Sequence, residues 1–280
     1  MTAMTLSLDQ TRTRPTPVGW PTTVRRTVTS ELIKLRAIRS YAWLLGVATA
    51  FTAVLGPIQS LGQVLAGSSE PPGSAADAVS VALTGASTAN LLLGVLGVLL
   101  VTGEYTSRAI RTTFTLVPQR HRVVLAKAIA LALATVVTSV VAVALAVTVS
   151  FVILSQAGPY AGLHLGWGSP HVLHVAAAMV WYLVGWSLLG LAAGWLIRSK
   201  IGGVAVLIGF MYIVPPLVGL LPQSIGRVLV GLMPSSAGSA MLSVESGGGL
   251  GSPIAGFAIW TGYLVLFTAL SGWVASRRDA

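Results

Sequence analysis

Few residues of this chain have the types and the spacing that catalysis or metal binding needs. His171 and His174 lie three residues apart, but no nearby carboxylate or third histidine completes a metal site. Ser87 could act as an intramembrane nucleophile only if a base converged on it, and the sequence indicates none. The chain has no cysteine, which excludes disulfides, thiolate metal sites and cysteine catalysis. We therefore predict a protein that is not an enzyme and holds no metal.

The sequence also lacks a nucleotide-binding motif. No Gly-x-x-x-x-Gly-Lys-Ser/Thr pattern occurs, so the backbone cradle and the lysine that hold nucleotide phosphates are missing. We predict no cofactor in this chain. If ATP drives the protein, a separate partner chain must bind the ATP and its magnesium ion.

Long apolar stretches make up most of the chain. Hydrophobic residues account for 54% of the sequence and charged residues for 9%, and the mean hydropathy is +0.83, which leaves too little charge for the surface of a water-soluble domain. A transmembrane helix needs about 20 mostly apolar residues. Six segments meet this requirement: 41–65, 78–102, 128–155, 172–197, 201–221 and 254–275. They are continuously apolar rather than alternating, so we predict an all-α integral membrane protein whose six-helix transmembrane domain covers 41–275.

The basic residues predict the orientation of these spans. Sixteen of the 17 Lys and Arg fall on one side of the predicted membrane, and Arg227 alone falls on the other. The sixteen are Arg12, Arg14, Arg25, Arg26, Lys34, Arg36 and Arg39 before the first span, Arg108, Arg111, Arg120, Arg122 and Lys127 between the second and third, Arg198 and Lys200 between the fourth and fifth, and Arg277 and Arg278 at the end. Cytoplasmic loops carry the excess of basic residues. Both termini are therefore predicted to be cytoplasmic, including a short tail at 276–280.

The net charge of +10 raises the question of a nucleic-acid partner. The basic residues lie next to predicted spans, without interleaved aromatic residues or a binding module, so we exclude nucleic acid. Anionic membrane lipids are the predicted partner, because each Lys or Arg near such a surface is worth about 1 kcal/mol.

Two cytoplasmic segments have residue spacings that are typical of helices. After a predicted disordered tail at 1–21, the segment 22–40 places Val24, Val28, Leu32, Leu35 and Ile38 at spacings of four and three, which indicates an amphipathic helix in the membrane interface. In the loop 103–127, Ile110, Phe114 and Val117 share a helical face and Pro118 ends it. Spacing alone allows plainer alternatives, namely a juxtamembrane anchor and a solvated loop whose arginines only fix the topology.

The predicted spans contain few polar side chains. Gln59, Gln63 and Asn90 lie at membrane depth, where such residues either line a water-filled path or form hydrogen bonds between helices. Gly190 and Gly194 have the small-residue spacing that allows helices to approach closely. Pro215-Pro216 must interrupt the fifth span or end it, and the outer loop 222–253 either is flexible or contains a re-entrant turn.

Taken in order, several motifs resemble the membrane (permease) subunit of bacterial type-2 ABC exporters. These are Ser30-Glu31-Leu32-Ile33-Lys34-Leu35-Arg36 before the first span, Gly103-Glu104-Tyr105 at the end of the second, the segment from Ile110 to Pro118, and Arg122 to Lys127 at the start of the third. The resemblance covers the whole chain in the number and order of spans. The turn Gln119-Arg120-His121-Arg122 departs from the simpler small-residue and arginine turn that the family pattern leads us to expect.

The resemblance implies a half-transporter. In this family, a connecting helix before the first span and a coupling helix between the second and third contact a separate ATP-binding cassette ATPase, and two permease subunits pair around the path. The implied ATPase contacts are Glu31, Lys34, Arg36, Glu104, Arg108, Arg111, Phe114 and Pro118, and Gln59, Gln63 and Asn90 are candidates for the translocation path.

We accordingly expect the permease subunit of an exporter in a bacterial inner or plasma membrane. The nearly uncharged interior favours a hydrophobic or amphipathic substrate, such as a lipid-like molecule, an antibiotic or a peptide. The alternative is a transporter or membrane scaffold that works without an ATPase. A carrier coupled to protons or sodium should have ionisable residues in mid-span, and the sequence has none there.

Overall fold

Helices form the computed structural model of the chain, which describes residues 20–66, 75–107, 120–156, 165–244 and 249–277. Those ranges contain no strand, and six of their helical segments are long and apolar enough to cross a membrane. The six candidate spans are α2 (Arg39–Leu65), α4 (Ala86–Thr106), α6 (Arg120–Ser155), α7 (Val172–Ile197), the segment Lys200–Gly219 and α12 (Pro253–Arg277). The predictions of an all-helical fold and of six apolar spans are confirmed.

Shorter helices complete the described part of the chain. They are α1 (Trp20–Ala37) before the first span, α3 (Ala75–Ala82) before α4, and α10 (Gln223–Leu232), α11 (Pro234–Leu242) and the 3-10 turn η3 (Gly249–Gly251) before α12. The expected disordered tail at 1–21 and the expected helix from Ile110 to Pro118 lie mostly or wholly outside the described residues.

Two spans differ in detail from the sequence prediction. The expected span 78–102 is divided, because a turn after α3 separates it from α4, which continues to Thr106. The third span is longer than expected, since α6 starts at Arg120 and its 36 residues extend over about 54 Å at 1.5 Å per residue. A hydrocarbon core of about 30 Å is shorter than that, so part of α6 must lie outside it.

The fifth span contains the interruption that its two prolines predict. It consists of α8 (Lys200–Ile208), the π-helical turn η2 (Gly209–Ile213) and α9 (Val214–Gly219). Pro215 and Pro216 lie in the first turn of α9 and have no N–H to donate to the preceding turn. The wider turn just before them is a common way for a helix to accommodate such a break.

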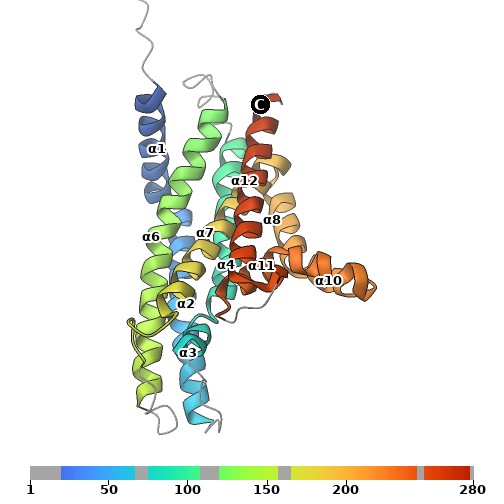
Figure 1. Ribbon diagram of the computed structural model, residues 1–280. Coiled ribbons are helices and arrows are strands. Elements are labelled where there is room, and N and C mark those ends of the chain that lie inside the picture. Colours follow the sequence, from blue (N-terminus) through green and yellow to red (C-terminus); the bar gives the residue numbers. More distant parts are fainter. Residues whose placement is uncertain (1–19, 67–74, 108–119, 157–164, 245–248, 278–280) are drawn as a thin grey trace, which may run out of the picture.

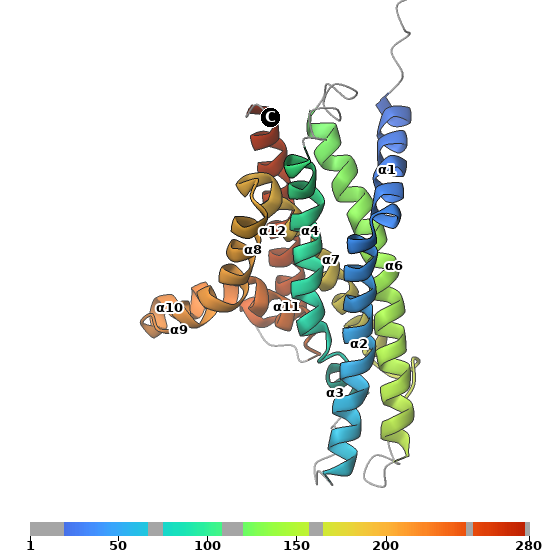
Figure 2. The ribbon, with the colours of Figure 1, turned by 180° about the vertical axis from the view of Figure 1, so that it is seen from behind.

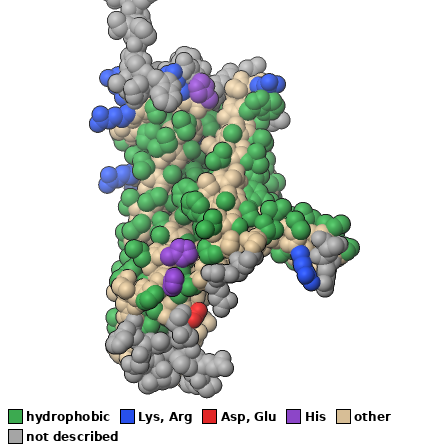
Figure 3. All heavy atoms as spheres, in the orientation of Figure 1, with side chains coloured by type: hydrophobic (Ala, Val, Ile, Leu, Met, Phe, Trp, Pro, Cys, Tyr) green, Lys and Arg blue, Asp and Glu red, His purple; other side chains and the backbone are tan. Residues whose placement is uncertain are grey.

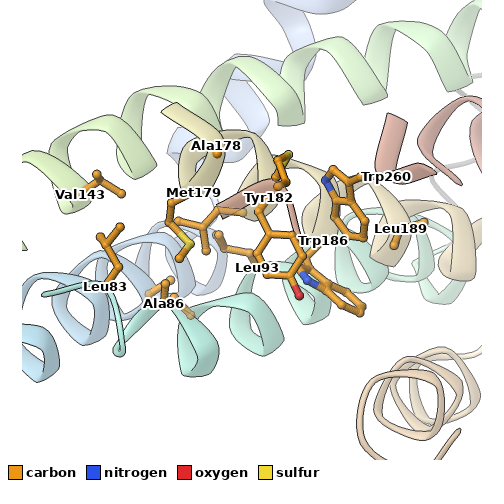
Figure 4. Packing of buried hydrophobic residues seen from close by; sticks show 14 of the residues in the cluster. Leu83, Ala86, Leu93, Val143, Ala178, Met179, Tyr182, Trp186, Leu189 and Trp260 are labelled. Atoms are coloured by element: carbon orange, nitrogen blue, oxygen red, sulfur yellow. The ribbon is translucent and has the colours of Figure 1, made fainter. Parts of the chain in front are cut away.

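Helix α7 lies at the centre of the bundle and is the most buried of the candidate spans. Figure 4 shows Tyr182 and Trp186 of α7 packed beside Trp260 of α12. The ring centroids of Tyr182 and Trp260 are 4.9 Å apart, and those of Trp186 and Trp260 are 5.5 Å apart. The Trp260 ring lies over Gly185, where a Cβ would be 2.3 Å from the indole, so a glycine is needed for this packing.

Glycines also bring α4 and α7 into backbone contact. A Cβ added at Gly190 of α7 would lie 1.9 Å from the carbonyl oxygen of Gly94, and one added at Gly97 of α4 would lie 2.1 Å from the carbonyl oxygen of Ser187. Gly194 packs in the same way on Val98. The small-residue spacing seen in the sequence is therefore used, and it makes α4 and α7 the most closely packed pair of helices.

The two chain ends that the structure describes lie at the same end of the bundle. Figures 1 and 2 show α1 running beside the first part of α6, close to the line of α2, and the end of α12 reaching the same level. This end carries Lys34, Arg122, Lys200 and Arg277, and we call it the basic end. How α1 lies relative to a membrane surface stays a prediction.

The expected outer loop 222–253 contains two helices. α10 and α11 meet at Met233-Pro234 with a bend of 71°, a geometry shared by broken spans and re-entrant loops. α11 packs on α7 and α12, whereas α10 projects sideways from the bundle in both views. A seventh span is therefore possible only if this bent pair crosses the membrane.

The close packing of α4 and α7 predicts a strong effect of a side chain at position 190. Gly190→Leu should lower the midpoint of thermal unfolding in detergent, because overpacking usually costs about 1–3 kcal/mol and the obstacle here is backbone. Gly46→Leu is the matched control, since a Cβ there meets nothing within 4 Å. Equal midpoints for the two variants would contradict the packing described.

Candidate functional site

Four charged side chains from three helices meet at the basic end. Glu31 and Lys34 come from α1, Glu104 from α4 and Lys127 from α6. Lys127 Nζ lies 2.5 Å from Glu31 Oε2 and 3.0 Å from Glu104 Oε1. Lys34 Nζ lies 2.6 Å from Glu31 Oε1 and 2.9 Å from Glu104 Oε1. Each lysine therefore donates to both carboxylates, and we call this arrangement the charge network.

The charge network is largely removed from solvent. The exposed fraction of the side chain is 0% for Lys127, 1% for Glu31, 11% for Glu104 and 37% for Lys34. A buried single charge is very costly, but two anions and two cations at these distances compensate one another. Removing one member leaves an unbalanced buried charge, so the network links its three helices strongly.

The local sequence explains how the network forms. Glu31 and Lys34 are three residues apart on α1 and so project from the same helical face, next to the buried Leu35. Glu104 lies in the last turn of α4, and Lys127 lies about two turns into α6 between Ala126 and Ala128. The small neighbours leave room for α1 to pack on α6 around the lysine.

The two carboxylates control the protonation of Lys34. Burial by itself lowers the pKa of this lysine, but hydrogen bonds and charge from Glu31 and Glu104 outweigh burial and raise its pKa above the ordinary value of 10.5. Lys34 therefore keeps its proton at neutral pH. One carboxylate oxygen of Glu104, Oε2, is buried and has no hydrogen-bond partner among the described residues.

A second group of side chains connects α4 to the end of α7. The Tyr105 ring meets Trp195 edge to face at 6.0 Å, and the Arg198 guanidinium lies 5.2 Å from the Tyr105 ring centroid. Arg198 ends α7 in the left-handed conformation, with φ of 57°. On the first span, the Tyr41 hydroxyl donates to the Leu99 carbonyl at 3.2 Å. The basic end of α4 is thus held by α1, α2, α6 and α7.

The structure brings together three of the predicted ATPase-contact residues. Glu31, Lys34 and Glu104 belong to the charge network, whereas Arg36 is exposed on α1. Arg108, Arg111, Phe114 and Pro118 lie outside the described residues. Lys127 was not among the candidate site residues predicted from the sequence, although it was used there as a basic residue next to a span and as the end of the motif that starts the third span. The sequence does contain a signal for this role. Lys127 lies in an apolar segment with no acidic residue within four positions, so it needs an acidic partner on another helix.

The three candidate path residues have different surroundings. Gln59 is exposed on α2, Gln63 is half-buried, and Asn90 is buried on α4 with its Oδ1 atom unpartnered among the described residues. A cavity between α2, α4, α6 and α7 is lined by Thr52, Ser139 and Leu183 among others, but by none of these three. Its volume of about 10 Å³ is far too small for a transported molecule.

Both histidines considered for metal binding are exposed. His171 precedes α7 in the left-handed conformation, with φ of 65°, and His174 lies in the first turn of that helix. Across the described ranges, no three His, Asp or Glu side chains are grouped as metal ligands would be.

A scan against protein-family models finds no match, and a search of curated proteins finds none at the significance required. The fold and its apolar spans define the class directly: the chain is an all-helical, multi-pass membrane protein.

The charge network predicts how stability responds to removing a lysine. Lys127→Met leaves two carboxylates with Lys34 as their one network cation, so it should destabilise the protein by about 3–5 kcal/mol. Adding Glu31→Gln restores the charge balance, and the double variant should be more stable than Lys127→Met alone. Both effects are measured by heating the protein in detergent and recording the loss of the monodisperse species as it unfolds.

Arg36→Met is the control for that comparison. It removes a basic residue at an exposed position of α1, the helix that carries Glu31, and such changes usually stay within about 0.5 kcal/mol. Strictly additive effects of Lys127→Met and Glu31→Gln would show that the two residues are not coupled.

Proposed function

We propose that this chain is the membrane subunit of a type-2 ABC exporter, driven by a separate ATP-binding cassette ATPase. The observation that carries the proposal is the charge network. It joins α1, α4 and α6 at the end of the bundle where residues 108–119 connect α4 to α6. These are the two segments that the family resemblance assigns to contact with the ATPase.

The network gives a physical route for coupling. A force applied to α1, or to the segment after α4, acts on groups that also hold Lys127 of α6. Breaking the network would expose buried charges to an apolar surrounding, so the three helix ends move together more easily than separately. The buried Oε2 atom of Glu104 has no hydrogen-bond partner among the described residues, so this carboxylate can accept a further hydrogen bond.

A second permease subunit, identical or related, is part of the proposal. The cavity inside the bundle has a volume of only about 10 Å³, so the interior of one copy offers no room for a substrate at that position. The candidate spans α2 and Lys200–Gly219 are mostly exposed, with 28% and 11% of their most apolar windows buried, and a second copy could cover them. The path would then lie between two copies.

The substrate class follows from the charges of the spans. In the described spans, the charged residues lie near the helix ends, for example Arg39, Glu104, Lys127 and Arg277. A path formed between such helices favours a hydrophobic or amphipathic molecule, such as a lipid-like compound, an antibiotic or a peptide. We place the protein in a bacterial plasma membrane with both termini in the cytoplasm, as the distribution of basic residues predicts.

Copurification tests the proposal directly. The tagged chain, extracted in mild detergent, should bring with it in fixed stoichiometry a chain that carries the phosphate-binding motif absent here, and the complex should hydrolyse ATP. Transport by the chain without any nucleotide hydrolase would instead support a carrier that needs no ATPase.

Charge reversal at the predicted contact provides the functional prediction. Arg111→Glu should reduce substrate-stimulated ATPase activity of the assembled complex by about tenfold, because one contact of about 1.4 kcal/mol changes an equilibrium by that factor. Membrane insertion should stay unchanged. Arg227→Glu, the same change on α10, should leave stimulation at the level of the unmodified protein. Equal stimulation in both variants would remove the coupling role of Arg111.

A further inference from the structure

A groove of about 720 Å³ runs along the outer face of the bundle between α6, α7 and α12. Its wall on α12 includes Thr261, Leu264, Thr268, Gly272 and Ser276. These positions recur every three or four residues, so they form one continuous face of the helix. The charge network does not touch this groove, and the proposed ATPase contact does not explain it.

The length of the groove matches one leaflet of a membrane. From Thr261 to Ser276, α12 rises by about 22 Å at 1.5 Å per residue. Half of a bilayer core is about 15 Å, and the rest reaches the headgroup region. Its deep end is marked by Trp181, whose indole N–H donates to the Thr261 hydroxyl at 3.4 Å. On the other side of Trp181 lies a separate hollow of about 370 Å³, lined by His174 and Phe257 among others.

The two ends of the groove differ in charge. The deep part is lined by apolar and hydroxyl side chains, whereas His121 and Ser276 lie at its mouth at the basic end. The guanidinium of Arg277 lies 4.4 Å from the ring centroid of Trp273, which forms part of the wall. Figure 3 shows this face, with hydrophobic side chains over its middle and basic side chains toward the end where α1 and the C-terminus lie.

We propose that this groove binds one acyl chain of an anionic phospholipid, with the headgroup held at the mouth by Arg277 and His121. The volume falls within the roughly 300–1,000 Å³ of sites for small molecules. The walls are open to the side, since Val265 and Trp273 are 64% and 55% exposed, so a lipid can enter from the membrane. A basic mouth above an apolar channel matches a molecule with a negative headgroup and a long chain.

A second copy of the chain fits the groove less well than a lipid does. A helix packed from another subunit would contact α12 along its whole length, but Trp181 ends the groove at Thr261, the ninth of the 25 residues of α12. The division into two hollows on either side of Trp181 instead follows the two leaflets of a bilayer. The inference does not depend on the ATPase partner.

The test uses the purified full-length chain in neutral detergent and phosphatidylglycerol with brominated acyl chains. Bromine quenches nearby indoles, and Trp181 and Trp273 both line the groove, so binding should produce saturable quenching of tryptophan fluorescence. Phosphatidylcholine with the same brominated chains should bind more weakly by about fivefold, the contribution of one basic residue near an anionic headgroup.

Two glycines of α12 provide matched variants. A Cβ at Gly272 or at Gly262 meets nothing within 4 Å, so both positions accept a larger side chain, but only Gly272 lines the groove. Gly272→Leu fills the channel and should weaken phosphatidylglycerol binding by about tenfold, whereas Gly262→Leu should leave it within about twofold. Arg277→Gln should remove the preference for phosphatidylglycerol over phosphatidylcholine.

Three outcomes would overturn the proposal. The first is equal affinity for the two lipids in the unmodified protein, and the second is an equal loss of binding in Gly272→Leu and Gly262→Leu. The third is a change from dimer to monomer in Gly272→Leu without loss of quenching, which would make the groove an interface between copies. None of these results would affect the proposed ATPase contact, which is measured by copurification.

Discussion

The rest of the structure depends on one constraint, the burial of two cations and two anions at one end of an otherwise apolar bundle. Lys127 is fully buried in α6, where its ammonium group donates hydrogen bonds to Glu31 and Glu104 from two other helices. This requirement fixes how α1 packs on α6 and where α4 ends. Ser107, the last described residue before the segment that joins α4 to α6, lies three residues beyond Glu104.

Helix α4 connects this charged end to the apolar centre. Its glycines bring its backbone against α7, and α7 in turn packs Tyr182 and Trp186 around Trp260 of α12. The close backbone contacts between α4 and α7 would thus carry a displacement of the charge network to the core. Closely packed helices transmit such shifts, because there is no free space between them to absorb the movement. The π-helical turn at Gly209–Ile213 lies in the least buried span and is a natural place for bending.

The sequence was enough to predict the six spans, because each span needs only a sufficiently long apolar run. Their orientation was predicted from the basic residues, which gather in the loops on one side. It also selected Glu31, Lys34 and Glu104, but through a family resemblance rather than through their geometry. The partner Lys127 was missed because the Lys127–Glu31 pair is separated by 96 residues, and no local pattern indicates which helices meet. The split before α4 and the groove on α12 were missed for the same reason, since both depend on packing between distant segments. For 222–253 the sequence left a re-entrant turn as one of two alternatives, and the bent pair α10 and α11 has a geometry that fits it.

The central claim is that an ATPase acts on this membrane protein through the end of α4, and reactivity of a cysteine at position 107 tests it most directly. The chain has no cysteine, so Ser107→Cys introduces a single reactive thiol at an exposed residue after α4. The account predicts that the rate of maleimide labelling changes when a non-hydrolysable ATP analogue is added to the assembled complex, and stays constant for the chain alone. An unchanged rate in a complex that still hydrolyses ATP and moves its substrate would contradict it.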